Sequence, residues 1–173
     1  MIPDIEVQLQ VAIKSLKDNV APAVDKQNSL AQEQMHLSLA TIEIALKHLP
    51  LVHGYVRKDI GEHIAIAKKL TDVCSREEDK SLLRQGIAAA ESALNNPELG
   101  FVQLQAAARE LREKIGITII ECSATADAPA VEKTVLDMCG TTMGIARAWT
   151  KPHGFEPNPA DVVDLEVQLG FAD

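Results

Sequence analysis

Apolar residues recur every three or four positions along most of the chain, which is the period of a helix that buries one face. Residues 4–20 also alternate as a strand would, but the length of this run and its helical continuation through Leu16 and Val20 favour a helix. The periodic segments are residues 4–20, 29–50, 51–74, 75–94, 96–122 and 127–149. We therefore predict an all-α fold, an up-and-down antiparallel bundle of about six helices.

The segment 29–50 has the clearest start and stop. Ser29 and Gln32 have the spacing of a capping box, and Pro50 closes the run. Its main apolar face contains Ala31, Met35, Leu39, Ile42, Leu46 and Leu49, and a smaller second face contains Leu37, Ala40 and Ile44. Because two faces are apolar, we predict that this helix is buried on two sides and is central to the bundle.

Local signals set the other helix boundaries. Ser75 and Glu78 form a second capping-box pattern, and Asn96 before Pro97 predicts a further helix start. The β-branched stretch 116–123 is assigned to a helix because a single strand would have no partner. The last long helix opens near Asp127 and carries a near-heptad seam of Val131, Val135, Met138, Thr142, Ile145 and Trp149.

A Pro-rich arm follows the last long helix. We divide the chain into a helical domain, residues 1–150, and a C-terminal arm, residues 151–173, that packs on the same domain or on a neighbouring subunit. In the arm, Val163, Leu165, Val167 and Leu169 alternate with polar residues, so a strand, an extended arm or a short helix is open. Residues 164–169 also repeat residues 4–9 at five of six positions.

Apolar residues outside the main stripes predict an interface. Val7 and Val11 lie away from the main apolar face of the first helix, so that helix has two apolar faces. Together with Val163, Leu165, Val167 and Leu169 they form a candidate surface for another subunit. We predict a homo-oligomer, with a dimer favoured.

Composition and charge exclude several classes of partner. The net charge is -8 and the few aromatic residues are scattered, which argues against nucleic acid and anionic membranes as partners. Apolar runs are too short to span a bilayer, and the first residues do not resemble a signal peptide. The three cysteines lack CxxC spacing, as expected of buried thiols in a reducing compartment. We expect a cytoplasmic protein.

One pattern suggests a metal site. Glu33 and His36 have the Glu-x-x-His spacing of carboxylate-bridged di-iron bundles, and Asp59, Glu62 and His63 offer further ligands on the next helix. The motif occurs once, and His36 falls on the polar face of its helix, which favours a solvated surface. We therefore expect no cofactor, with a divalent metal at these five residues as the alternative.

No catalytic or nucleotide-binding motif such as GxGxxG, HExxH or GxSxG is present, and no motif assigns an activity. The leading hypothesis is a non-catalytic interaction or scaffold module that self-associates. One alternative is a carboxylate and histidine metal-binding protein, either an enzyme or a metal carrier. The other is a binder of small apolar ligands, because the Ala-rich segments Ala88 to Ala90 and Ala106 to Ala108 leave room between helices.

Overall fold

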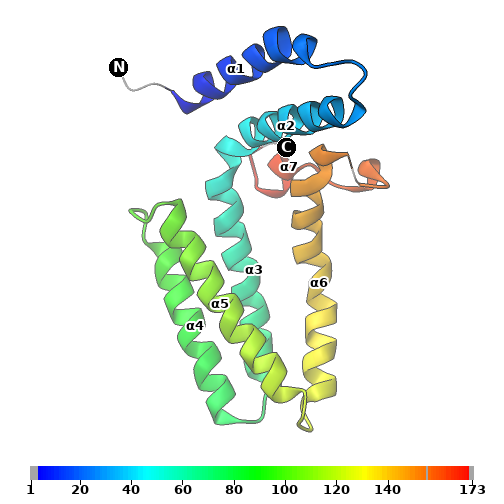
Figure 1. Cartoon of the computed structure of the whole chain (residues 1–173). Helices are drawn as coiled ribbons and strands as arrows, with labels where there is room; N and C mark the ends of the chain where they lie inside the picture. The colour runs from blue at the N-terminus through cyan, green and yellow to red at the C-terminus, as the bar shows by residue number, and fades with distance from the viewer. Residues whose placement is uncertain (1–3, 155, 172–173) are drawn as a thin grey trace. The chain divides into compact units, whose positions relative to one another are not determined.

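The computed structural model describes residues 4–154 and 156–171, and these two ranges contain helices and connecting turns but no strand. The all-α prediction is confirmed (Figure 1). The α-helices are α1 (Ile5–Ser15), α2 (Ser29–His48), α3 (Val52–Val73), α4 (Glu77–Asn95), α5 (Phe101–Cys122), α6 (Ala128–Thr150) and α7 (Leu165–Gln168).

The chain forms two compact units. Unit 1 comprises Met1–Leu51 with Thr150–Pro159, and unit 2 comprises Val52–Trp149 with Ala160–Asp173. The chain therefore passes between units three times, whereas the sequence suggested a single division at residue 150.

Unit 1 begins with α1, whose N-cap is Asp4. The Asp4 carboxylate accepts a hydrogen bond from the backbone N–H of Glu6 at 2.9 Å, which satisfies one of the free donors of the first turn. After Ser15 the helix widens into a π turn, Leu16–Val20, and tightens into a 3-10 turn, Ala21–Ala23, which contains Pro22. The prediction of helix rather than strand here is confirmed.

The predicted capping box of α2 is wrong. Asn28, one residue earlier, is the N-cap, and its Oδ1 accepts a hydrogen bond from the backbone N–H of Ala31 at 3.0 Å. The amide of Gln32 instead donates to the carbonyl oxygen of Val24 at 2.9 Å. Gln32 thus ties the preceding linker to the helix rather than capping it.

The prediction that α2 is the central helix is also wrong. His48 is its one buried residue, and Leu30 and Leu37 are exposed. The helix packs against α1 and against the 3-10 turn Lys151–His153 within unit 1. α1 and this short turn are too small to cover both apolar faces of α2.

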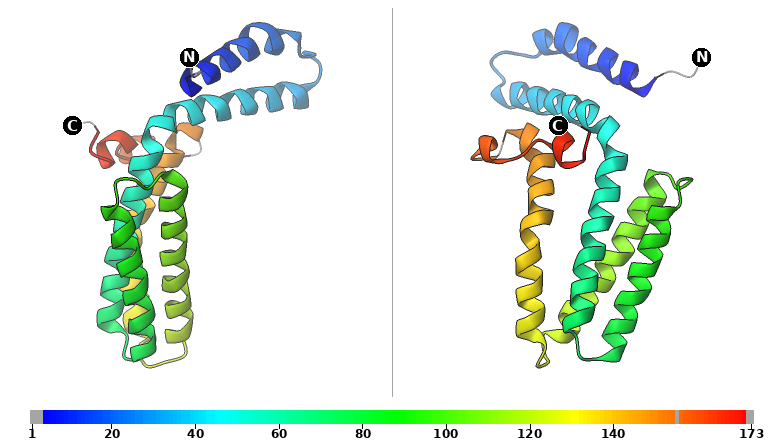
Figure 2. Two further views of the ribbon diagram at one scale, coloured as in Figure 1. Left: turned by 90° about the vertical axis from the view of Figure 1, so that its left-hand side faces the viewer. Right: turned by 180° about the vertical axis from the view of Figure 1, so that it is seen from behind.

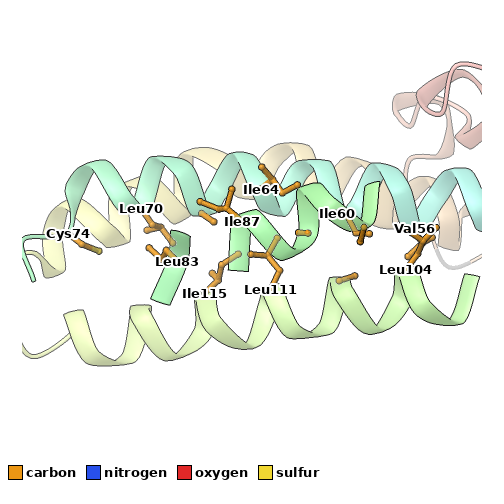
Figure 3. Packing of buried hydrophobic residues seen from close by; sticks show 14 of the residues in the cluster. Val56, Ile60, Ile64, Leu70, Cys74, Leu83, Ile87, Leu104, Leu111 and Ile115 are labelled. Carbon is orange, nitrogen blue, oxygen red and sulfur yellow. The ribbon is translucent and has the colours of Figure 1, made fainter. Parts of the chain in front are cut away.

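The hydrophobic core lies in unit 2, where α3, α4 and α5 pack against one another (Figures 2 and 3). The buried apolar residues of these helices recur every three or four positions. The core includes Val56, Ile60, Ile64, Ala67, Leu70, Leu83, Ile87, Ala90, Leu104, Ala108, Leu111 and Ile115. Successive helices of this unit, α3 to α6, alternate in direction, as predicted (Figure 2).

The α6 helix is less covered than the three core helices. Val131 and Ile145 of its predicted seam are buried, but Val135, Met138 and Thr142 are half-buried. Leu136 and Met143 on its flank are exposed. The seam therefore faces the bundle, and much of the remaining apolar surface of α6 is open.

Two predicted helix starts in unit 2 are wrong. α4 begins at Glu77 after the N-cap Arg76, so Ser75 is not its cap. Asn96 ends α4, and its side chain accepts a hydrogen bond from the N–H of Glu98 at 2.9 Å. This local turn delays α5 until Phe101. The β-branched stretch at the end of α5 is helical, as predicted.

The C-terminal arm contains the short helix α7, which selects one of the three predicted conformations. Asp164 is the N-cap residue of α7, as Asp4 is of α1, so the two copies of the repeated hexapeptide both begin helices. The amide of Gln168 donates to the carbonyl oxygen of Gly144 on α6 at 3.3 Å. A side chain at Gly54 on α3 would collide with the ring of Phe171, 2.7 Å away. The part of the arm that belongs to unit 2 therefore packs on α3 and α6 of the same unit.

Candidate functional site

The five residues of the predicted metal site fall on two helices in different units. Glu33 and His36 lie on α2 and are exposed, whereas Asp59, Glu62 and His63 lie on α3 and are half-buried. In the described part of the chain, no three His, Cys, Asp or Glu side chains are grouped as metal ligands would be. Because α2 and α3 belong to separately placed units, the metal site stays a prediction.

Asp59 and His63 form an Asp–His pair on one face of α3. The Nδ1 atom of His63 lies 2.7 Å from the backbone carbonyl oxygen of Asp59 and 3.3 Å from its Oδ1. Arg112 of α5 lies 3.6 Å from the other carboxylate oxygen. Glu62 points elsewhere and pairs with Lys58 at 3.3 Å. The carboxylate of Asp59 thus lies between the imidazole of His63 and the guanidinium of Arg112.

This arrangement changes the acid–base properties of its members. Burial disfavours the charged imidazole of His63, but its hydrogen bonds to Asp59 outweigh burial and raise the pKa of His63. Burial and the nearby Asp59 carboxylate raise the pKa of Tyr55, one turn earlier on α3. The ring of Tyr55 packs on that of Trp149 with a centroid distance of 4.3 Å. Tyr55 therefore lies next to the Asp59–His63 pair and also contributes to an aromatic contact between α3 and α6.

A second cluster, which we call the dithiol cluster, consists of Cys74, Asp79 and Cys122. The Sγ atoms of Cys74 and Cys122 lie 3.5 Å apart, and both cysteines are buried. The Sγ of Cys122 donates to Oδ2 of Asp79 at 3.6 Å. The same carboxylate oxygen lies 3.5 Å from Nε of Arg76. Asp79 is thus a buried carboxylate with one thiol and one guanidinium as partners.

Both thiols of the dithiol cluster are held in the protonated form at neutral pH. Burial raises the pKa of Cys122 to about 12, and its contacts with Cys74 and Asp79 add to the effect. Burial also raises the pKa of Cys74. The ordered S–H groups are therefore hydrogen-bond donors in the resting protein rather than nucleophilic thiolates.

Sequence reasoning foresaw buried cysteines but not this cluster. Cys74 and Cys122 are 48 residues apart and meet because α3 and α5 both end at the same end of the bundle. A recognisable signal was present in the placement of each cysteine at the end of a predicted helix. Asp79, three residues into α4, carried no signal because an acidic residue is common in the first turn of any helix.

Three pockets lie within unit 2. A pocket of about 340 Å³ between α5 and α6 is mostly apolar, and one of about 490 Å³ on α3 and α4 is crossed by the Lys68–Glu91 ion pair. A third, of about 360 Å³, lies between α6 and the C-terminal arm. Of the Ala-rich segments, Ala90 and Ala108 are buried in the packed core, whereas Ala88 lines the pocket on α3 and α4.

The predicted interface residues differ in exposure. Val7 and Val11 on α1 are exposed, as are Val163 and Val167 in the arm, and Leu169 is half-buried. Leu165 is 3% exposed, which removes it from the set that could contact a partner. α1 has no buried residue at all.

Comparison with known proteins gives no relative. No family model, curated protein or solved structure matches the chain. Among the described helices, none combines the length and the apolar character needed to cross a membrane. The function must therefore be argued from the residues themselves.

Proposed function

We propose that this protein is a non-catalytic helical interaction module that self-associates through α1. The observation that supports this proposal most directly is a row of exposed residues along the helix, which we call the outer seam of α1. It consists of the N-cap Asp4, then Val7, Val11 and Lys14 of the helix, and Asp18 in the π turn that follows. The spacing of three and four residues is the heptad spacing that helices use to pack side by side.

The outer seam of α1 lies opposite the face that packs on α2. Leu9, Ile13 and Leu16 are half-buried on that inner face, in the helix pair that Lys17 and Glu43 join by an ion pair. Val7 and Val11 are 53% and 63% exposed. The two valines are neighbours on one helix face, so together they form the apolar centre of the seam, from which a helical partner would exclude water.

The charges of the seam favour a second copy in antiparallel orientation. If Val7 of one copy faces Val11 of another, Asp4 faces Lys14 at both ends of the contact. A parallel pair would instead place Asp4 against Asp4 and Lys14 against Lys14, which repel. The seam is thus complementary to itself under a two-fold axis, the commonest symmetry of homo-oligomers.

The contact would be small. Two valine pairs and two ion pairs bury less area than a stable dimer interface of about 1,200–2,000 Å². We therefore expect reversible association with a Kd on the order of tens of micromolar or weaker. Lys14 already forms an ion pair with Asp18 at 3.0 Å, so its position in the seam is set before association.

The first experiment is sedimentation velocity of the full chain over a dilution series up to about 1 mM. We expect a concentration-dependent dimer that is lost in Val7→Glu and Val11→Glu. Val102→Glu on α5, where the valine is 73% exposed, adds the same charge elsewhere and should leave association unchanged. A monomer throughout the series, or a dimer indifferent to both α1 substitutions, would refute the proposal.

A double-mutant cycle tests the antiparallel orientation. Lys14→Glu should weaken association, because it places an acid against Asp4. The same substitution should cost less in an Asp4→Asn background, since asparagine keeps the helix cap but removes the charge. Equal effects in both backgrounds would contradict the pairing of residues 4 and 14.

A further inference from the structure

The dithiol cluster combines two features that neither cysteine would have alone. The Sγ atoms of Cys74 and Cys122 are 3.5 Å apart, and a disulfide requires about 2.05 Å, so an approach of about 1.5 Å would join them. Cys74 directly follows α3, and Cys122 is the last residue of α5. Side chains at helix ends can make such an approach without breaking the hydrogen bonds of a helix interior.

Asp79 supplies a place for the thiol proton. Its Oδ2 accepts the hydrogen bond of the Cys122 thiol at 3.6 Å, and its side chain is only 5% exposed. In the resting protein this contact keeps the proton on sulfur, and Asp79 is placed to take it up only as the sulfur forms its bond to a peroxide oxygen. Arg76, 3.5 Å from the same oxygen, keeps the carboxylate in place.

We propose that Cys74 and Cys122 form a redox-active dithiol that small peroxides oxidise to an intramolecular disulfide, with Asp79 accepting the proton of Cys122. Both sulfur atoms are almost inaccessible to water, since Cys74 is 2% and Cys122 0% exposed. Burial excludes large oxidants such as protein disulfides. It leaves hydrogen peroxide and small alkyl hydroperoxides as the substrate class.

The reaction balances in two steps. The sulfur of Cys122 attacks one peroxide oxygen while Asp79 takes up the thiol proton; the O–O bond breaks, giving a sulfenic acid and an alkoxide or hydroxide to which Asp79 returns the proton. The sulfur of Cys74 then attacks the sulfenic sulfur, the S–O bond breaks, and water leaves with the thiol proton of Cys74. Two thiols and one peroxide yield one disulfide, one alcohol or water, and one further water.

The third cysteine provides an internal control. Cys139 lies on α6 and is half-buried, and no thiol contact is described for it. If oxidation followed accessibility, Cys139 would react first and would join chains to one another. The proposal instead places the bond between the two least accessible sulfurs.

Peptide mapping tests this directly, because trypsin places the three cysteines in separate peptides, 70–76, 115–133 and 134–147. The full chain is treated with hydrogen peroxide under native conditions, quenched with an alkylating agent, digested and analysed by mass spectrometry. We expect peptides 70–76 and 115–133 joined, with two hydrogens lost. Sulfinic acid at Cys122 without this product, or linkage of either cysteine to Cys139 as the main product, would overturn the proposal.

Variants test the two roles. Cys139→Ser should keep the cross-link, and Cys74→Ser should abolish it and leave sulfenic acid at Cys122 for a dimedone probe to label. Asp79→Asn should slow disulfide formation at least tenfold, whereas Asp72→Asn, an exposed change nearby on α3, should leave the rate unchanged. Circular dichroism verifies that each variant is folded. An unchanged rate in folded Asp79→Asn would remove Asp79 from the mechanism, and the wild-type peptide map decides on the dithiol by itself.

Discussion

Asp127 accepts two hydrogen bonds from Ser75, one from the backbone N–H at 2.7 Å and one from the hydroxyl at 2.6 Å. Ser75 lies in the turn between α3 and α4, and Asp127 in the turn between α5 and α6. The contact joins two turns that are 52 residues apart in the sequence. It also explains why Ser75 does not cap α4, since its hydroxyl is committed to the other turn.

Stability should depend on the ionisation of Asp127. The two bonds from Ser75 lower the pKa of this carboxyl below its ordinary value of 3.8. A group with a lowered folded pKa stabilises the protein above its unfolded pKa, and the contribution disappears as pH falls through the folded pKa. Asp127→Asn should therefore lower the melting temperature at pH 7 and lose this effect in acid, once the pH falls below the lowered pKa of the folded protein.

Thermal unfolding followed by circular dichroism at pH 7 and in acid checks this prediction. Asp137→Asn on α6 is the matched control, because Asp137 is exposed and pairs with Lys133 within one helix. Its effect at pH 7 should be smaller than that of Asp127→Asn. Equal effects of the two substitutions at pH 7 would show that the bonds to Ser75 do not stabilise the fold.

The pair of Asp59 and His63 predicts a pH dependence of opposite sign. The pKa of His63 is raised above 6.5 in the folded protein, so the pair stabilises fully below the unfolded pKa and its contribution is lost as pH rises through the folded value. NMR titration of the imidazole protons should give a higher midpoint for His63 than for histidine in the unfolded chain. Asp59→Asn should lower that midpoint, and an unchanged midpoint would contradict the role of Asp59.

Two glycines in helices should respond oppositely to alanine. Gly116 has open space around its missing side chain, so Gly116→Ala should stabilise the protein by about 1 kcal/mol through helix propensity. At Gly86 an added Cβ would lie 2.8 Å from Lys114 and 3.1 Å from Leu111. Gly86→Ala should therefore gain nothing or destabilise. Urea unfolding of the two variants measures both effects, and equal gains would argue against close packing of α4 on α5.

Core truncations distinguish the two candidate central helices. Leu104 on α5 is fully buried, so Leu104→Ala should cost about 2–5 kcal/mol of unfolding free energy. Leu39, on the main apolar face of α2, is half-buried, and Leu39→Ala should cost about 1 kcal/mol. The free energies come from urea denaturation. A larger loss at Leu39 would restore α2 to the centre of the fold.

A buried hydroxyl offers a stabilising substitution. Thr118 on α5 is fully buried, and its Oγ1 forms no hydrogen bond with any of the described residues. Thr118→Val should stabilise by about 1–3 kcal/mol, because it removes a polar atom without a partner. Thr125→Val should destabilise, since that hydroxyl donates to the carbonyl oxygen of Cys122 at 2.9 Å. Thermal unfolding of both variants gives the comparison, and a loss of stability in Thr118→Val would contradict it.

Helical periodicity was enough to predict the fold class and part of the seam of α6, where Val131 and Ile145 are buried. It failed for α2, because an apolar face indicates that a helix can be buried but not that neighbours are available to bury it. The predicted helix starts were wrong where a polar side chain forms a hydrogen bond other than the expected helix cap. Ser75 bonds to a residue 52 positions away, and Asn96 closes its own turn, and neither choice is visible in local spacing.

The two candidate sites also differ in how far the sequence could predict them. Asp59 and His63 could be paired from sequence, because residues four apart share a helix face. The dithiol cluster could not, since it depends on where α3 and α5 end relative to one another. Its third member, Asp79, is set apart by being buried. Burial of an acidic residue near a helix start cannot be predicted from its position in the sequence.

The chain passes between the two units three times, which limits how the protein can be truncated without removing residues from both units. A fragment ending at Trp149 would remove Thr150–Pro159 from unit 1 and the α7 arm from unit 2. A fragment beginning at Val52 would keep unit 2 whole but carry ten residues that belong to the other unit. Neither unit corresponds to one uninterrupted stretch of codons, so a C-terminal deletion to Trp149 removes residues of both units, whereas an N-terminal deletion to Val52 removes residues of unit 1 alone.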